Sequence, residues 1–182
     1  MPRILYTIGH STRTTRELVE LLRAHRVEQV VDIRTIPGSR HNPQFNRPAL
    51  SRALHLVKIG YRHLKALGGL RHARPDSTNL GWRNASFRGF ADYMQTDGFA
   101  VGLARLKQIA TRRPTVIMCA EALPWRCHRS LIADALTVAG WRVLHIQNRQ
   151  TARPHKRTLF LKVRSGRLVY PAPRTDQRPR AA

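Results

Sequence analysis

Short apolar runs alternate along this chain with segments whose apolar residues recur at helical spacing. The runs occupy residues 4–8, 29–33, 61–64, 115–119 and 142–146, and helical patterns lie between them. Such alternation is typical of a parallel sheet with helices on both faces, because each crossover helix packs on the sheet that it connects. We therefore predict an α/β three-layer sandwich whose mainly parallel sheet has about five strands.

The length of the chain and a change in composition near residue 148 predict one domain followed by an extension. At 182 residues the chain can bury one sizeable core but not two. Residues 1–148 are predicted to form the α/β domain. Residues 149–182 form a basic tail with ten Lys or Arg residues against the single acid Asp176. Runs on either side of Ser165-Gly166 predict a β-hairpin, and the last ten residues are predicted to be disordered.

The charge of the chain indicates an anionic partner. Lys and Arg number 33 against 10 Asp and Glu, which gives a net charge of +23. A field of this sign attracts polyanions, so nucleic acid and phosphorylated ligands are the candidate partners. The alternative is that the excess of Arg reflects coding bias, since the basic residues are spread throughout the chain. The sequence does not indicate an oligomeric state.

The cellular compartment is predicted from two features that the sequence does not contain, a membrane span and a secretory signal. No apolar run approaches the roughly 18 residues of a membrane span, so no membrane partner is expected. The first residues do not resemble a secretory signal, which predicts a cytoplasmic protein. Cys119 and Cys127 are eight positions apart, and in a reducing compartment they should be free thiols.

Polar residues follow every predicted strand. Ligands of open parallel sheets bind beyond the carboxyl ends of the strands, so these residues are the first candidates for a site. They are His10, Ser11, Asp32, Arg34, His63, Cys119, Glu121, His145 and Gln147. The alternative is that they are ordinary strand ends, because any strand must end in a polar loop.

Two segments carry the strongest local signals. Cys127, His128 and Arg129 are predicted at the start of a helix, where basic residues are favourable if an anion binds there. Helical spacing places His128 on the face that packs against the sheet. In the second segment Arg34, with Ser39 and Arg40, could clamp a phosphate or carboxylate. The alternatives are a solvated Arg129 and an Asp32–Arg34 pair that merely holds the loop.

Cys119 ends a strand predicted to be buried. Most buried cysteines are inert small hydrophobes. A nucleophilic thiolate needs electropositive surroundings, which Arg126, Arg129 and the helix start could supply. Zinc is a third interpretation, with Cys119, Cys127, His128 and His10 as ligands, although the spacing is not that of a standard zinc motif. We assign no metal and no cofactor from the sequence.

Several short motifs, in order from residue 4 to residue 148, resemble a known family. They are Thr7-Ile-Gly-His-Ser11, Val31-Asp-Ile-Arg34 with Pro37 and Ser39, Tyr61 to His63 with Leu67-Gly-Gly69, Phe90 with Tyr93-Met94, and Met118-Cys-Ala-Glu121 with Cys127-His-Arg129. Together they resemble the bacterial and archaeal domain of unknown function 488 family. The resemblance implies the α/β fold and points to these residues without assigning a reaction.

Two functional hypotheses follow. In the first, the protein is an enzyme acting on a phosphorylated or nucleic-acid substrate. Its anion-binding residues are Ser11, Arg34, Ser39, Arg40, Cys127 and Arg129. His10 or His128 transfers protons, Glu121 orients one of these histidines, and Cys119 is the nucleophile or redox group. In the second, the protein is a non-catalytic nucleic-acid binding module that uses its basic surface and tail.

Overall fold

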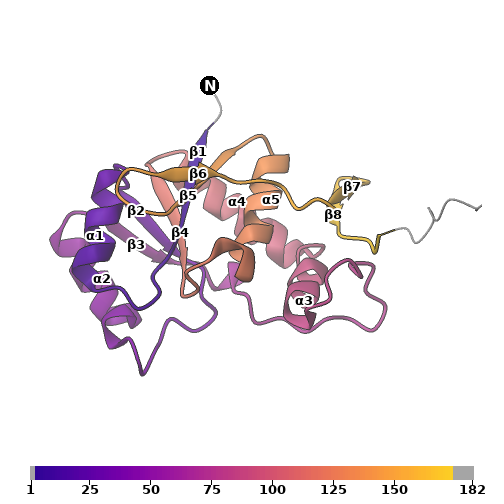
Figure 1. The fold of residues 1–182 in the computed structure, drawn as a ribbon, viewed down its shortest axis with the longest axis horizontal. Coiled ribbons are helices and arrows are strands. Elements are labelled where there is room, and N and C mark those ends of the chain that lie inside the picture. Colours follow the sequence, from indigo (N-terminus) through magenta and orange to yellow (C-terminus); the bar gives the residue numbers. More distant parts are fainter. Residues whose placement is uncertain (1–2, 174–182) are drawn as a thin grey trace, which may run out of the picture.

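A computed structural model describes residues 3–173, which form a sheet flanked by helices and a small hairpin (Figure 1). The strands are β1 (Ile4–Gly9), β2 (Gln29–Asp32), β3 (Gly60–His63), β4 (Thr115–Cys119), β5 (Arg142–Ile146), β6 (Ala152–Pro154), β7 (Lys162–Arg164) and β8 (Arg167–Val169). The helices are α1 (Thr15–Ala24), α2 (Arg47–Leu56), α3 (Ala85–Tyr93), α4 (Asp97–Ala110) and α5 (Arg129–Val138). Short 3-10 turns are η1 (Pro43–Phe45), η2 (Lys65–Leu67) and η3 (Pro124–Arg126).

The main sheet has six strands in the order β3-β2-β4-β1-β5-β6. All pairs among β1 to β5 are parallel, and β6 adds to β5 in the antiparallel sense. Every residue of β2 and β4 is buried, as expected for central strands covered on both faces. The predicted mainly parallel α/β sandwich is confirmed, with one strand more than the pattern indicated.

Helices cover the two faces of the sheet separately (Figure 1). Successive residues of β4 alternate between the two cores, because side chains along a strand point to opposite faces. Val116 and Met118 pack with α1 and α2, and Ile117 and Cys119 pack with α3, α4 and α5. The α1 helix begins at a capping box, in which Thr14 and Glu17 each bond the other's backbone N–H.

The order of the strands creates a switch point between β1 and β4. These neighbours pair in register, with Gly9 beside Cys119. The chain leaves β1 into α1 on one face of the sheet and leaves β4 into α5 on the other face. The two connections therefore diverge and leave a crevice at the carboxyl ends of β1 and β4, where open α/β sheets bind ligands.

The extension after residue 148 is more closely integrated than its composition indicated. β6 joins the main sheet, and Tyr170 is completely buried in the core on the α5 side. His155, Thr158 and Tyr170 all bond the buried carboxylate of Asp134 in α5. Apolar and hydrogen-bonding residues interspersed among the basic ones therefore attach this segment to α5.

The predicted hairpin is confirmed as the pair β7 and β8. Ser165 and Gly166 form its turn with φ angles of 47° and 75°, the left-handed pair that a tight type I′ turn requires. The predicted disorder of the last ten residues concerns positions that, beyond residue 173, lie outside the described part of the chain. Within that part, no helix is long and apolar enough to cross a membrane.

Candidate functional site

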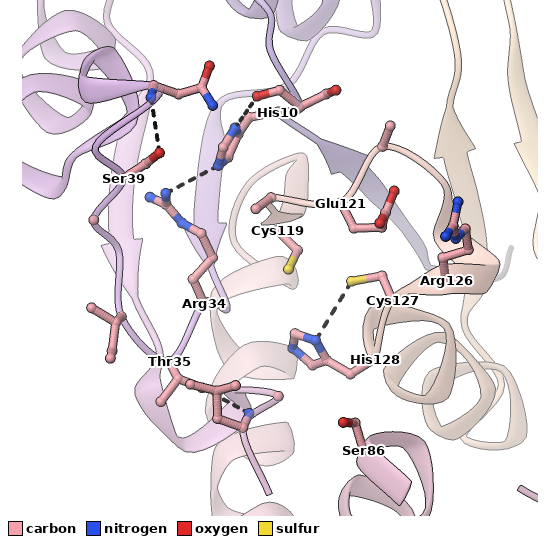
Figure 2. Close-up of a pocket in the computed structure, with 18 of the residues that line it drawn as sticks. His10, Arg34, Thr35, Ser39, Ser86, Cys119, Glu121, Arg126, Cys127 and His128 are labelled. Atoms are coloured by element: carbon pink, nitrogen blue, oxygen red, sulfur yellow. Dashed lines mark hydrogen bonds between the residues drawn. The ribbon is translucent and has the colours of Figure 1, made fainter. Parts of the chain in front are cut away.

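A cleft of about 700 Å³ opens at the switch point between β1 and β4 (Figure 2). It brings together eight of the ten residues that the sequence analysis singled out as catalytic or anion-binding. They are His10, Ser11, Arg34, Ser39, Cys119, Glu121, Cys127 and His128. Arg40 and Arg129 are not among the residues that line it. The expectation that strand-end residues share one cleft is therefore met for His10, Arg34, Glu121 and His128.

The floor of the cleft holds two sulfur atoms and an imidazole. Cys119 lies at the end of β4, and Cys127 and His128 come directly before α5. The sulfurs of Cys119 and Cys127 and a ring nitrogen of His128 lie within 4.8 Å of one another. In Figure 2 both sulfurs face the His128 ring, whose Nδ1 is 3.7 Å from the Cys127 sulfur.

The backbone fixes the orientation of His128. Its Nε2 lies 3.1 Å from the carbonyl oxygen of Leu67 and 3.3 Å from that of Ile33, so Nε2 carries a proton and donates it to them. Nδ1 is consequently the nitrogen presented to the cysteines. Gly69 permits this placement, because a Cβ there would collide with the imidazole. The sequence prediction that His128 points inward toward the sheet is confirmed.

The surroundings favour a thiolate at Cys119. Hydrogen bonds from Cys127, and then from His128 and the backbone N–H of Glu121, lower the pKa of Cys119 to about 4 against the opposing effect of burial. The pKa of Cys127 is raised, because its thiol is the donor to Cys119 and is itself buried. The contacts of the two cysteines therefore favour the thiolate at Cys119 over the thiolate at Cys127.

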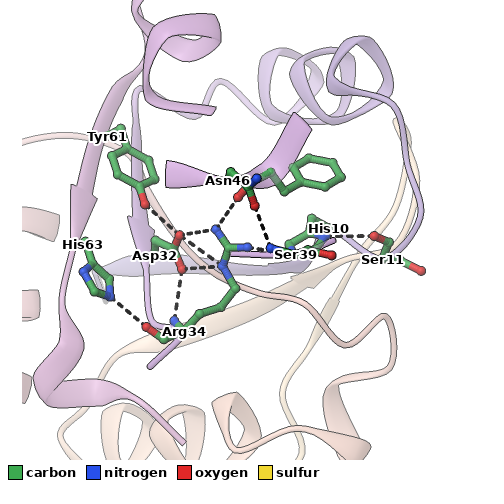
Figure 3. Close-up of polar contacts among 9 residues, drawn as sticks. His10, Ser11, Asp32, Arg34, Ser39, Asn46, Tyr61 and His63 are labelled. Atoms are coloured by element: carbon green, nitrogen blue, oxygen red, sulfur yellow. Dashed lines mark hydrogen bonds and ion pairs between the residues drawn. The ribbon is translucent and has the colours of Figure 1, made fainter. Parts of the chain in front are cut away.

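A second chain of polar contacts forms one wall of the cleft (Figure 3). The buried Asp32 carboxylate accepts hydrogen bonds from Arg34 Nε at 2.9 Å and Nη2 at 2.6 Å, and from the Tyr61 hydroxyl at 2.8 Å. Arg34 also donates to the Phe45 carbonyl oxygen. These contacts agree with the alternative considered from the sequence, in which an Asp32–Arg34 pair holds the loop after β2.

His10 extends this chain in a defined protonation state. Arg34 Nη1 lies 3.2 Å from His10 Nε2, and a guanidinium can only donate, so Nε2 accepts. Nδ1 therefore carries the proton and donates to the Ser11 carbonyl oxygen at 2.8 Å. Burial, followed by the Arg34 charge, lowers the pKa of His10. His10 is thus a neutral ring with both nitrogens engaged, stacked on Phe45.

Arg129 has a different place from the one predicted. Its side chain is 1% exposed, and its guanidinium donates to the carbonyl oxygens of Glu121 and Ala122. Arg129 therefore holds the loop after β4 from inside the protein and is not a free anion ligand. The Glu121 carbonyl and the Ala122 N–H belong to the same trans peptide unit and point in opposite directions. The Ala122 N–H therefore points away from Arg129. The sequence could not distinguish an inward from an outward arginine at the start of a helix.

Arg40 and Glu121 also differ from their predicted roles. Arg40 is exposed and does not line the cleft. Glu121 lines the cleft, but its carboxylate accepts the N–H of Leu123 at 3.1 Å and bonds neither His10 nor His128 in the described structure. Glu121 thus caps its own loop and does not orient a histidine.

The structure adds lining residues that the sequence analysis did not assign to the site. Ser86 and Phe87 come from the first turn of α3. Arg126, named from the sequence only as a source of positive charge near Cys119, is exposed on η3 and also lines the cleft. The sequence signal that could have located Ser86 and Phe87 is Asn84. Its side chain caps α3 by accepting hydrogen bonds from the N–H groups of these two residues. A capping asparagine in an otherwise aperiodic stretch marks the helix start that faces the cleft.

Three residues have the donor atoms and the spacing to hold a metal ion: Cys119, Cys127 and His128. Two sulfurs and an imidazole whose other nitrogen donates to backbone carbonyls suit a soft cation such as Zn²⁺. His10, the further ligand considered from the sequence, is not part of this group.

The fold and the cleft together define a doubly wound α/β protein with a cysteine–histidine site at its switch point. The chain belongs to the family described as domain of unknown function DUF488, whose model matches residues 14–136. This match confirms the family indicated by the sequence motifs, although the Thr7–Ser11 motif precedes the matched range. Comparisons with curated proteins and with solved structures gave no match.

Proposed function

We propose that the cleft is the active site of an enzyme that hydrolyses a phosphate ester, on a small molecule or a nucleic acid, through a covalent intermediate on Cys119. The observation that carries this proposal is the meeting of Cys119, Cys127 and His128 at the floor of an open cleft at the switch point. Cys119 is 9% exposed, yet it lines the cleft, so a substrate could reach its sulfur.

The reaction has two steps. The Cys119 thiolate attacks phosphorus, an S–P bond forms, and the ester P–O bond breaks. The leaving oxygen takes a proton from Nδ1 of His128, the ring nitrogen that faces the sulfurs. Water then attacks phosphorus and gives one proton to Glu121, the S–P bond breaks with the thiolate restored, and inorganic phosphate leaves. The proton on Glu121 returns through solvent to His128, which restores the starting state. Of the two histidines considered, we propose His128 for the proton transfer, since both nitrogens of His10 are already engaged.

Other residues of the cleft supply charge and a base. Arg126 is exposed at the rim and can pair with phosphate oxygens. Among the residues that line the cleft in the described part of the chain, Glu121 is the only carboxylate. We propose it as the base for the attacking water. Arg34 keeps the wall in place through Asp32.

The test combines turnover with protection from alkylation. p-Nitrophenyl phosphate is the turnover probe, and iodoacetamide modification of Cys119 is followed by mass spectrometry with and without orthovanadate. We expect slow hydrolysis that Cys119→Ser abolishes and vanadate protection of Cys119. Cys127→Ala is the matched variant, in which loss of the hydrogen bond should slow alkylation of Cys119 near neutral pH. Equal hydrolysis by Cys119→Ser, or neither hydrolysis nor protection in the parent protein, would contradict the proposal.

Two alternatives give different outcomes in the same test. A non-catalytic nucleic-acid binding module, the second hypothesis from the sequence, would show no Cys119-dependent turnover and would bind DNA equally well as Cys119→Ser. A metal centre on Cys119, Cys127 and His128 would bind Zn²⁺ stoichiometrically, and a chelator would then increase alkylation of both cysteines.

A further inference from the structure

A groove follows the open edge of the sheet, outside the cleft described above. Strand β3 is the edge strand of the six-stranded sheet. Two cavities, of about 420 and 160 Å³, adjoin there and share Arg62 on β3 with Arg105 and Ile109 on α4. The first cavity extends to Arg47 at the start of α2, and the second extends to the turn after α4. The two cavities together form what we call the β3 groove.

Five arginines line the β3 groove, and all are exposed: Arg47, Arg62, Arg105, Arg112 and Arg113. Within residues 3–173, none of these guanidinium groups forms an ion pair, and no carboxylate lines either cavity. The Asp32 carboxylate, which accepts a hydrogen bond from the Tyr61 hydroxyl of the groove lining, is already paired with Arg34 (Figure 3). The positive charge of the groove is therefore uncompensated.

The fold alone does not account for this concentration of charge. One charged residue on an edge strand, such as Arg62, suffices to discourage pairing with another sheet. The other four arginines lie on α2, on α4 and in the turn that follows α4. Like charges gathered in one groove repel one another and lower stability unless an anion binds among them.

We propose that the β3 groove binds the phosphate backbone of a nucleic acid without reading its sequence. The four residues of β3 span about 13 Å at roughly 3.3 Å per residue, which is the length of a row of several phosphates along one strand of a duplex. Gln29, Ser51 and Gln108 add hydrogen-bonding groups that can contact phosphate oxygens. A recessed groove with these groups fits a backbone better than a flat anionic membrane.

One hydrogen bond joins the lining of the β3 groove to the lining of the candidate cleft. His63, which ends β3 and lines the groove, donates from Nε2 to the Arg34 carbonyl oxygen at 2.8 Å (Figure 3). Arg34 in turn lines the cleft. His63 therefore connects the lining of the groove to Arg34 in the wall of the cleft. Binding in the groove does not depend on the reaction proposed for Cys119.

The experiment measures how DNA affinity depends on salt. The full chain and the double variant Arg62→Gln/Arg105→Gln are titrated with fluorescent duplex DNA at several potassium chloride concentrations. We expect the slope of log affinity against log salt to fall by about 1.8 in the variant, because each lost phosphate contact contributes about 0.9. The matched control is Arg23→Gln/Arg83→Gln, which removes the same charge at two other exposed arginines and should keep most of the slope.

Further measurements make the result decisive. Thermal melts should be alike for all three proteins, since the substituted side chains are exposed. Iodoacetamide should modify Cys119 at the same rate in all three, which separates failure of the groove proposal from failure of the proposed catalysis. An unchanged slope in the groove variant would overturn the inference. So would loss of binding to phosphatidylserine vesicles in that variant with DNA binding intact, because the groove would then serve a membrane surface.

Discussion

His145 is a half-buried ring in the middle of a chain of hydrogen-bonding groups. Thr7 Oγ1 is 2.7 Å from His145 Nδ1, His145 Nε2 is 3.0 Å from His155 Nδ1, and His155 Nε2 is 2.8 Å from Asp134 Oδ1. The Asp134 carboxylate accepts from His155 Nε2, and a single proton lies between His145 Nε2 and His155 Nδ1. A neutral His145 satisfies every member of this chain.

This arrangement predicts acid sensitivity. Burial, followed by the charges of His155 and Arg129, lowers the pKa of His145 to about 4. The unfolded chain, with an ordinary pKa near 6.5, binds the proton first as the pH falls. Stability contributed by neutral His145 is therefore complete above pH 6.5 and is lost as the pH falls toward 4. The loss is on the order of 3 kcal/mol, and urea unfolding across this pH range measures it.

The matched pair for this prediction is His145→Gln and His41→Gln. His145→Gln should be less stable near neutral pH but should show a shallower decline of the unfolding free energy between pH 6.5 and 4. His41 is exposed, and its replacement should leave the decline unchanged. If His145→Gln declines as steeply as the parent protein, His145 is not the responsible group.

At the scale of elements, Asp134 is the point where α5 holds the C-terminal segment. Its carboxylate is completely buried and accepts from the His155 ring, from the backbone N–H and hydroxyl of Thr158, and from the Tyr170 hydroxyl. Asp134→Ala would leave these donors without a partner inside the protein. We expect a loss of about 3–5 kcal/mol in the free energy of unfolding by urea.

The control for Asp134 is a carboxylate of similar charge on the surface. Asp76→Ala removes an exposed acid that lies 3.6 Å from Arg74, and such a pair contributes about 0–1 kcal/mol. The two variants should therefore differ by several kcal/mol in urea. Similar midpoints and slopes would show that the segment around Tyr170 is attached mainly by other contacts.

The helices and strands also show which structural features could be predicted from the sequence and why others could not. Periodicity located β4 and β5 to the residue, and the inward side of α5 correctly placed His128. Periodicity could not predict the strand order, because no local pattern shows that β4 inserts between β1 and β2. The direction of Arg129 was equally hidden, since it depends on two loop carbonyls that only the folded chain brings beneath the helix start.

At the scale of the molecule, the net charge is +23, and two regions are candidates for binding polyanions through it. The sequence alone predicts that the basic extension supplies affinity for polyanions, and that remains a prediction. The structure directs attention to the β3 groove, on the edge of the sheet opposite to β6. Because β3 and β6 are the two ends of the strand order, variants in the groove and in the extension can be tested independently.

The closing prediction concerns whether residues 1–148 form a domain on their own. A chain cut after Asn148 loses β6, the burial of Tyr170 and the partners of Asp134. Burial of one large side chain contributes about 1.5–3 kcal/mol, and a buried carboxylate left without partners costs about 3–5 kcal/mol. These losses approach the roughly 5–15 kcal/mol that stabilises a typical domain, so we expect the cut chain to melt well below the parent protein or without cooperativity. A chain cut after Pro173 keeps every contact described above and is the control. A cooperative melt of residues 1–148 at the temperature of the full chain would instead show that the domain ends where the composition changes.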